Sequence, residues 1–313
     1  MKEELNRMHL LNIFSKLIYW PVCRDYARHL ENEPADSWLR LLSRFQFRRV
    51  HGFWPNYHNP RHFTEKLWCR MLLERNPQLT LFCDKLLVQK FVSSRIGSQY
   101  LVPLLWSGKD PKSIPFDELP SRFVLKTNHG CAYNILVPDK AKLDVPGAIS
   151  QLERWLRTNF CTATYLGISW GYRNIPPAIL VEEYLGENDQ PPVDYKFYCF
   201  GKRVEFLTVH YNRFSDHKTR SFDRQFAPYN FSYDFEQWDG HCEKPANFDE
   251  MVKVAEALAD GCEFVRVDLY SVGPKIYFSE LTPYPGGVST KILPRSTDLA
   301  LGGQWKVATP ARH

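Results

Sequence analysis

The feature that most constrains the fold is a series of paired apolar segments, each pair joined by a short turn. The pairs are residues 123–127 with 134–137, 194–200 with 203–209, and 264–270 with 275–281. Single segments at 146–160 and 249–259 lie between them, with apolar residues at helical spacing. Hairpins that alternate with single helices predict an α+β chain with antiparallel or mixed sheets, rather than a doubly wound parallel sheet.

The composition is that of a globular chain with a mild basic excess. The chain has 313 residues, of which 44% are hydrophobic, and 40 basic residues stand against 35 acidic ones. The resulting net charge of +5 suits an anionic substrate. No basic run resembles a nucleic-acid-binding arm, so we expect no nucleic-acid partner.

The sequence indicates a cytoplasmic protein. No stretch approaches the roughly 20 apolar residues that span a bilayer, and Glu3 and Glu4 stand where a signal peptide would be basic. The eight cysteines include no CxxC motif, which favours reduced thiols over a zinc site. Peripheral membrane contact stays open for the amphipathic segment 9–20, although packing against the protein is favoured there.

Two carboxylates in the last pair of segments suggest a metal site. Arg266 and Asp268 are two residues apart, so they share one face of a strand. Glu280 and Thr282 share a face of the partner strand in the same way. A turn of odd length would make Asp268 and Glu280 neighbours, and Mg²⁺ would suit the position between two such carboxylates. The alternative is a surface Arg–Asp pair beside an unrelated glutamate, which the apolar strands disfavour.

Three further positions carry weaker signals. Lys126 precedes a turn at 128–133, where it could reach phosphates, although a lysine whose stem packs and whose ammonium reaches water is the simpler interpretation. Glu182 and Glu183 end an apolar strand that could line an adenine ring. Lys196 could bind phosphate or simply pair with an aspartate two residues earlier. Neither a Walker motif nor GxGxxG is present.

In combination and in order, these segments resemble the ATP-grasp superfamily, and most closely its TupA-like branch of teichuronopeptide biosynthesis. The segments that carry the resemblance are residues 63–67, 84–85, 123–130, 181–185, 194–200, 264–270 and 277–282. The resemblance extends from about residue 60 to the end of the chain. It implies two α+β lobes that clasp ATP between their sheets. The implied boundaries are a helical region at 1–60, the start of the unit at 61–120, a small lobe at 121–185 and a large lobe at 186–313.

The resemblance also implies roles for individual residues. The implied nucleotide-binding residues are Lys126, Asn128, His129, Gly130, Glu182, Glu183, Tyr184 and Leu185. The implied magnesium ligands are Asp268, Glu280 and Thr282, the last standing where many members carry Asn. Lys196 and Arg266 would neutralise the transferring γ-phosphate. The loop is less rich in glycine than is usual, with Cys131, Ala132 and Tyr133 after Gly130, and we expect it to move less.

The implied activity is that of an ATP-dependent carboxylate–amine ligase acting through an acyl phosphate. The implied partners are ATP with Mg²⁺, an acidic sugar or polysaccharide precursor, and an amine, in bacterial surface-polysaccharide assembly. Cations and aromatics at 210–220 suit an anionic sugar, and a solvated basic loop explains them equally well. A glycosyltransferase and an ATP-grasp-type sugar kinase are the alternatives. The absence of any Asp-x-Asp from the sequence disfavours the transferase.

Overall fold

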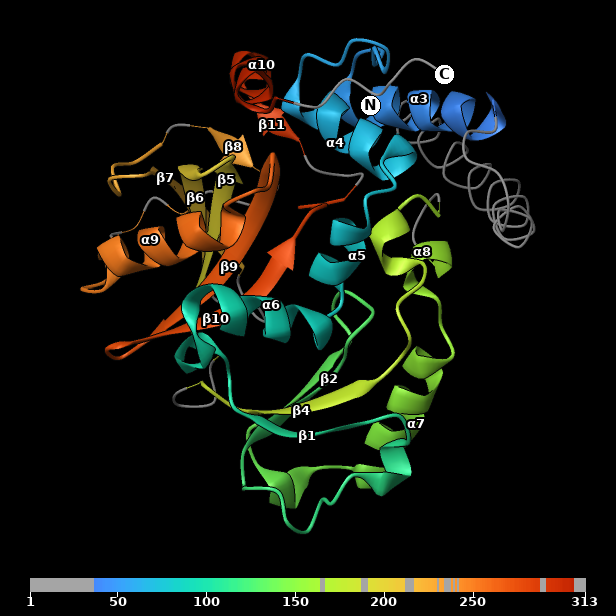
Figure 1. Cartoon of the computed structure of the whole chain (residues 1–313), viewed down its shortest axis with the longest axis vertical. Helices are drawn as coiled ribbons and strands as arrows, with labels where there is room; N and C mark the ends of the chain where they lie inside the picture. The colour runs from blue at the N-terminus through green and yellow to red at the C-terminus, as the bar shows by residue number, and fades with distance from the viewer. Residues whose placement is uncertain are drawn as a thin grey trace, which may run out of the picture.

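Two antiparallel sheets organise the chain (Figure 1). The computed structural model describes residues 37–163, 167–186, 191–211, 217–229, 231–233, 238, 240, 242–287 and 291–306. The amphipathic segment 9–20 lies outside these residues, as does most of the predicted helical region 1–60. Every pair of neighbouring strands in the described part is antiparallel, which confirms the predicted α+β class.

The smaller sheet has the strand order β1-β4-β2-β3. Its strands are β1 (Leu104–Gly108), β2 (Phe123–Thr127), β3 (Asn134–Val137) and β4 (Ile179–Glu183). Phe123, Leu125, Ile179 and Val181 are buried on one face, where helix α7 (Val145–Leu156) packs. Because side chains alternate along a strand, Lys126 and Glu182 lie on the opposite face.

The larger sheet has the order β10-β9-β5-β6-β7. Its strands are β5 (Asp194–Phe200), β6 (Arg203–Tyr211), β7 (Lys218–Asp223), β9 (Phe264–Val272) and β10 (Lys275–Thr282). One face is apolar and forms a core with helices α6 (Leu87–Ile96) and α9 (Phe248–Ala259). The alternate residues face the other side, where charged side chains such as Lys196 and Asp268 are nevertheless buried.

Figure 1 shows the four-stranded sheet at one end of the molecule and a group of helices at the other. These helices are α3 (Ser37–His51), α4 (Phe63–Leu73) and α10 (Arg295–Gln304). The remaining elements are α5 (Pro77–Cys83), α8 (Phe160–Ala163) and the short pair β8 (Ser232–Tyr233) with β11 (Ile292–Leu293). No helix of the described residues combines the length and apolar character that crossing a membrane requires. The seven described cysteines are all free thiols, as expected.

Several predicted boundaries need correction. The predicted helix 146–160 is two helices, because α7 ends at Leu156 and α8 begins at Phe160. The N-cap of α4 is His62, one residue before the helix begins. His62 forms a capping box with Glu65, whose carboxylate accepts the backbone N–H of His62 at 2.9 Å. Thr64 is occupied elsewhere, since its hydroxyl donates to Asp298 at 2.7 Å.

Asp298 fastens the last described helix to α4. Its Oδ1 accepts the backbone N–H of Thr64 at 2.9 Å, while Oδ2 accepts the threonine hydroxyl. Gly302, one turn further along α10, fits against the backbone at Arg61, where a Cβ would lie 2.0 Å from the carbonyl oxygen. The carboxylate and the glycine together fix α10 on α4, although more than two hundred residues separate them in the sequence.

Replacing Asp298 with Ala should lower the free energy of unfolding by about 1–3 kcal/mol, because two buried donors of Thr64 lose their acceptor. Urea denaturation of the variant and the wild type measures the difference. The matched control is Asp117→Ala at an exposed position, which should stay within about 0.5 kcal/mol of the wild type. Equal losses in the two variants would contradict this account of the α4–α10 contact.

Candidate functional site

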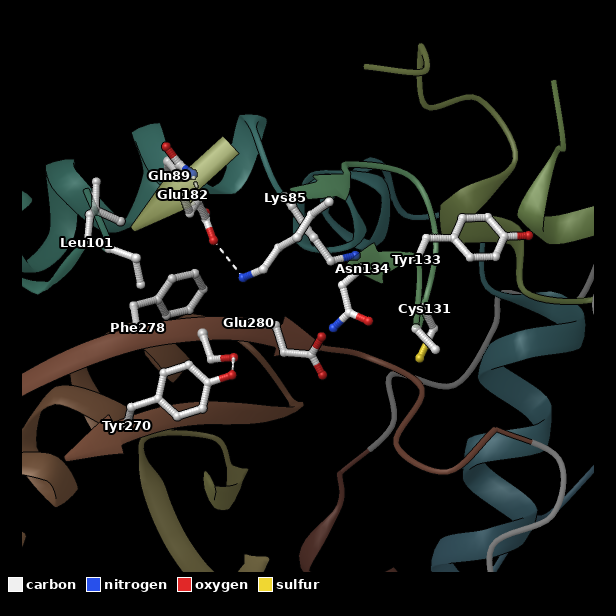
Figure 2. Close-up of a pocket in the computed structure, with 14 residues that line it drawn as sticks. Lys85, Gln89, Leu101, Cys131, Tyr133, Asn134, Glu182, Tyr270, Phe278 and Glu280 are labelled. Atoms are coloured by element: carbon white, nitrogen blue, oxygen red, sulfur yellow. Dashed lines mark hydrogen bonds and ion pairs between the residues drawn. The ribbon is translucent and has the colours of Figure 1, made fainter. Parts of the chain in front are cut away.

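A cleft with an empty volume of about 730 Å³ lies between the two sheets. Figure 2 shows side chains that enter it from both. The charged and amide side chains that line it are Lys85, Gln89, Lys126, Asn134, Glu182 and Glu280. Lys126, Asn134 and Glu182 come from the small sheet, whereas Glu280 projects from β10 of the large one. Groups of opposite charge therefore face each other across one cleft.

A second cavity of about 610 Å³ adjoins the first, and the two share Val102, Lys126, Asn134 and Tyr270. Val124 and Leu136 supply apolar surface to its lining. The chain segment 183–186, which leaves β4, forms another part of the wall. This cavity combines apolar surface with a stretch of backbone that can offer hydrogen bonds, a combination that suits a flat heterocycle.

Lys126 and Glu182 form an ion pair at the junction of the two cavities. Lys126 Nζ lies 2.5 Å from Glu182 Oε2, and Gln89 Nε2 donates to the other carboxylate oxygen at 3.3 Å (Figure 2). Burial disfavours the ammonium, but the attraction of the Glu182 carboxylate outweighs it and raises the pKa of Lys126. The cleft therefore keeps a charged lysine at the point where the two cavities meet.

Four predicted residues gather where the first half of β9 pairs with the end of β10. Arg266 forms a bidentate pair with Asp268, with Nε–Oδ1 and Nη2–Oδ2 distances of 2.6 Å. Its Nη2 also lies 2.7 Å from Oε1 of Glu280. Thr282 donates to that same oxygen at 2.7 Å. The guanidinium thus lies between the two carboxylates, in the position where the sequence suggested a metal ion.

A β-bulge brings Asp268 opposite Glu280. The turn between β9 and β10 has two residues, Gly273 and Pro274, so the expected turn of odd length is wrong. The register shifts between Phe278 and Glu280, which leaves Ser279 without a partner in the ladder. One extra residue on one strand restores the shared face, and Asp268 pairs with Glu280. The two carboxylates are neighbours as predicted, but the bulge brings them together, not a turn of odd length.

Lys196 connects this cluster to the middle of the sheet. Its Nζ lies 2.5 Å from Oδ2 of Asp194 and 2.5 Å from Oδ2 of Asp268. The registers of β5 and β9 place Lys196 directly beside Asp268. All three side chains are buried, and Asp268 is 0% exposed. Acidic and basic side chains therefore alternate through the cluster, and the cluster is shielded from water.

The cluster sets the ionisation of its carboxylates. Complete burial raises the pKa of Asp268 to about 6, against the opposing attraction of Arg266 and Lys196. Burial also opposes ionisation of Glu280, but Arg266 outweighs it and holds the pKa of Glu280 well below its usual range. Both groups are ionised at neutral pH, and Asp268 is the one that a modest fall in pH would protonate.

The two carboxylates are not equally available to a ligand. Both oxygens of Asp268 contact cations within the protein. Among the described residues, Glu280 uses only Oε1 in hydrogen bonds, and its carboxylate projects into the cleft (Figure 2). No group of three or more His, Cys, Asp or Glu in the described part could hold a metal ion. A site made here would depend on ligand oxygens, as is usual for Mg²⁺ bound with a phosphate chain.

Comparison with known proteins gives the family. A family model described as TupA-like ATP-grasp matches residues 65–306, which is well over half of the chain. The chain belongs to the TupA-like ATP-grasp family. Membership confirms the ATP-grasp fold expected from the sequence, and the match begins within helix α4, shortly after the region 1–60 that the resemblance did not cover.

Among solved structures, the chain is similar to ATP-grasp ligases. D-alanine–D-alanine ligase from Bacillus anthracis is 19% identical, with a TM-score of 0.39 over 71% of this chain and 63% of that one. The ATP-grasp ligase PsnB, complexed with a phosphomimetic variant of its minimal precursor, Mg and ADP, is 13% identical, with a TM-score of 0.39 over 74% and 61%. The chain therefore spans about three fifths of the length of these proteins. No curated protein matches it.

In this ATP-grasp chain the loop after β2, residues 128–133, is held from within the protein. The side chain of Asn128 accepts from the backbone N–H of Ala178 at 2.7 Å and donates to Asp84 at 3.0 Å. His129 Nε2 lies 3.0 Å from the carbonyl oxygen of Trp155. Neither side chain lines the two cavities, so both support the loop from behind rather than face the cleft. The backbone from Cys131 onward is the part of the loop that borders the cleft.

Gly130 and Tyr133 show how the loop is restrained. The carbonyl of Gly130 accepts a hydrogen bond from Lys85 Nζ. Tyr133 stacks on Trp155, with ring centroids 5.1 Å apart and planes 7° from parallel. Ala132, between them, has a φ of 59°, a left-handed conformation that side chains other than glycine rarely adopt. These contacts attach the loop to α7 and to the segment before α6.

Sequence reasoning assigned no chemical role to Lys85, Gln89 or Tyr270, which all line the cleft. Lys85 belongs to the segment 84–85 that carries part of the family resemblance, but nothing in its sequence spacing indicates a contact with the loop at 128–133. Tyr270 lies two residues beyond Asp268 on β9, so the alternation of the strand could have placed it on the same face. Asn134 pairs in register with Lys126, a contact that depends on the hairpin turn.

Replacing Lys196 with Met should lower the free energy of unfolding by about 3–5 kcal/mol, because two buried carboxylates lose the ammonium between them. Lys202→Met is the matched control, since Lys202 pairs with Asp260 at the surface with its side chain 76% exposed. The control should cost about 0–1 kcal/mol. Guanidinium denaturation of both variants measures the contrast. A loss below about 1 kcal/mol for Lys196→Met would contradict the buried bridge.

Proposed function

We propose that the chain is an ATP-dependent ligase that joins a carboxylate to an amine through an acyl phosphate. The observation that carries the proposal is the convergence of Lys126, Arg266 and Glu280 on facing sheets, beside a cavity with an apolar lining. Charged groups that are buried together are costly unless they meet a charged ligand or one another. A nucleoside triphosphate has the shape and charge to occupy both cavities at once, with its base in one and its phosphates in the other.

The second cavity is proposed to hold the adenine. Val124 and Leu136 would contact the ring, and the backbone from Glu183 to Leu185 would meet its polar edge. Asp194 lines the same cavity and is placed to accept from a ribose hydroxyl. Of the predicted adenine residues, Glu182 differs from the rest, because its carboxylate is paired with Lys126 at the junction. Its proposed role is to orient that lysine.

The first cavity is proposed to hold the phosphates. Lys126 and Lys85 line it, and both ammonium groups could screen phosphate oxygens. Arg266 would contact the phosphates beside Glu280, which lines this cavity and which Arg266 already contacts. Lys196 lies behind Asp268 and does not line either cavity. We therefore assign Lys196 to holding Asp268 ionised and oriented, and Arg266 to screening the transferring phosphoryl group.

Magnesium fits the residues present. Glu280 would be the first ligand, because it is ionised and keeps one oxygen free of hydrogen bonds to the described residues. Asp268 and Thr282 would complete the protein's share, and Asp268 would have to exchange one contact with Arg266 or Lys196. Bound Mg²⁺ would screen charge on the phosphate oxygens and polarise them. Arg266 would then release part of its hold on the carboxylates and turn toward phosphate.

The ligase reaction follows from what this arrangement can do. A carboxylate is a poor electrophile, and phosphorylation gives it a good leaving group. Cations fixed before the reaction stabilise the charge that develops on the transferred group without reorganising. An amine that attacks the acyl phosphate expels phosphate and forms an amide. Each step needs positioning and charge screening, which the cleft supplies.

The proposed substrates are an acidic sugar or polysaccharide precursor and an amine, in the cytoplasm of a cell that builds a surface polysaccharide. The supporting segment, 210–220, is described only in part, since residues 212–216 lie outside the described residues. His210 and His217 form a pair, with Nδ1–Nε2 of 3.0 Å, beside Thr208. A sugar kinase of the same family would share every nucleotide contact and differ only in its acceptor.

Mg-ATP at about 100 times its Kd should stabilise the wild type by roughly 2.7 kcal/mol, which thermal unfolding detects as a higher Tm. Glu280→Gln should lose most of this shift, because the neutral amide replaces the carboxylate that keeps a free oxygen. Glu118→Gln, an exposed position, is the control and should keep it. No shift in the wild type with any nucleotide would remove the basis of the ligase proposal.

A product assay distinguishes the ligase from its alternatives. With Mg-ATP and a uronic acid, hydroxylamine should trap an activated carboxylate as a hydroxamate, and ADP should appear in equal amount. Arg266→Met should reduce both products together by about a hundredfold or more, as expected when one charge-stabilising group is lost. ADP with a phosphorylated sugar would identify a kinase instead. Sugar-nucleotide consumption without ADP would identify a transferase.

A further inference from the structure

Helix α3 presents a cluster of exposed apolar side chains to solvent. Leu41, Phe45 and Trp54 are 41%, 52% and 45% exposed. Phe45 and Trp54 are in contact, with ring centroids 5.3 Å apart in an edge-on arrangement. Leu39 and Phe47, on the other side of the helix, are buried in the core. The helix is therefore apolar on two faces, and only one of them is covered by the described residues.

The segment that carries the exposed face is also basic. Residues 37–64 contain five arginines and no Asp or Glu. Removing these five from the 40 basic residues leaves 35, which balance the 35 acidic ones, so this segment accounts for the whole formal excess. Arg44 and Arg49 are exposed on either side of Phe45. Arg48 lies over the Trp54 ring, with 4.8 Å between its guanidinium carbon and the ring centroid.

We propose that this face of α3, with Trp54, docks on the surface of an anionic lipid bilayer. Arginines beside exposed aromatic and aliphatic side chains are typical of helices that lie in the interface, where the apolar groups enter the headgroup region and the guanidinium groups contact lipid phosphates. The long arginine stems can lie along apolar surface while their charged ends stay in water. The complementary charge identifies anionic lipid as the occupant.

The shape and position of the face support a bilayer rather than a peptide or a small ligand. The face is the outer side of a single helix, and no α3 residue lines either of the two cavities. Figure 1 shows α3 at the end of the molecule opposite the four-stranded sheet. A bilayer that contacts α3 would therefore leave the small sheet free. The inference does not depend on the nucleotide or on the ligase reaction.

The experiment is sedimentation of the full chain with vesicles of phosphatidylcholine alone, or of equal parts phosphatidylcholine and phosphatidylglycerol. The wild type should sediment with the anionic vesicles and stay in solution with the neutral ones. Arg44→Gln with Arg49→Gln should weaken the partition by about thirtyfold, since each arginine near an anionic surface contributes severalfold. Arg154→Gln with Arg157→Gln, at the C-terminal end of α7 and far from α3, removes the same charge and should leave binding unchanged.

Phe45→Ala tests the apolar part separately. It should weaken binding to anionic vesicles by about tenfold, because a phenyl group no longer enters the headgroup region. Leu105→Ala, at an exposed leucine on β1, is its control and should have no effect. Tm values equal to the wild type would show that all variants fold. The proposal would be overturned if the wild type did not bind anionic vesicles, or if the double variant Arg44→Gln with Arg49→Gln bound them as well as the wild type. It would also be overturned if sedimentation velocity showed a wild-type dimer that Phe45→Ala converts to a monomer.

Discussion

The interaction on which the site depends is the burial of Asp268 between two cations. Its carboxylate is fully buried and contacts both Arg266 and Lys196. An unpaired carboxylate in that position would be costly enough to threaten the fold, so the three groups form an interdependent unit. The same unit holds Arg266 against Glu280 at the edge of the cleft. Stability of the large sheet and readiness of the proposed phosphate site therefore rest on one set of contacts.

Strand alternation couples this unit to the hydrophobic core. Val267 and Leu269, on either side of Asp268, face the helices on the apolar side of the sheet. Any slip of register by one residue would exchange the two faces, burying charge in the core and exposing leucine to the cleft. The bulge at Ser279 is a local exception between β9 and β10, and it brings Glu280 beside Asp268. The core thus fixes the register, and the bulge sets which carboxylates meet.

The sequence predicted the class and the hairpins well, because strand alternation and helical spacing are local signals. It also placed Arg266 and Asp268 on one face of a strand, and Glu280 and Thr282 on one face of the partner strand, since residues two apart on a strand share a face. It could not give the turn length or the bulge, which depend on how two strands twist and pair. The hydrogen bonds of the Asn128 side chain could not be predicted for a similar reason, because its partners Asp84 and Ala178 are distant in the sequence. Contacts between separate segments require the tertiary structure.

Cations are used in two different ways in the cleft and on α3. In the cleft, Arg266 is buried and paired with carboxylates, so its charge acts over a short range and only on a ligand that enters. On α3, Arg44 and Arg49 are exposed, and salt screens their charge beyond about one Debye length. Exposed charges of this kind discriminate poorly between small anions, but they add up on an extended anionic surface. The buried cations of the cleft and the exposed cations of α3 are different residues in different elements, so changing one set leaves the contacts of the other in place.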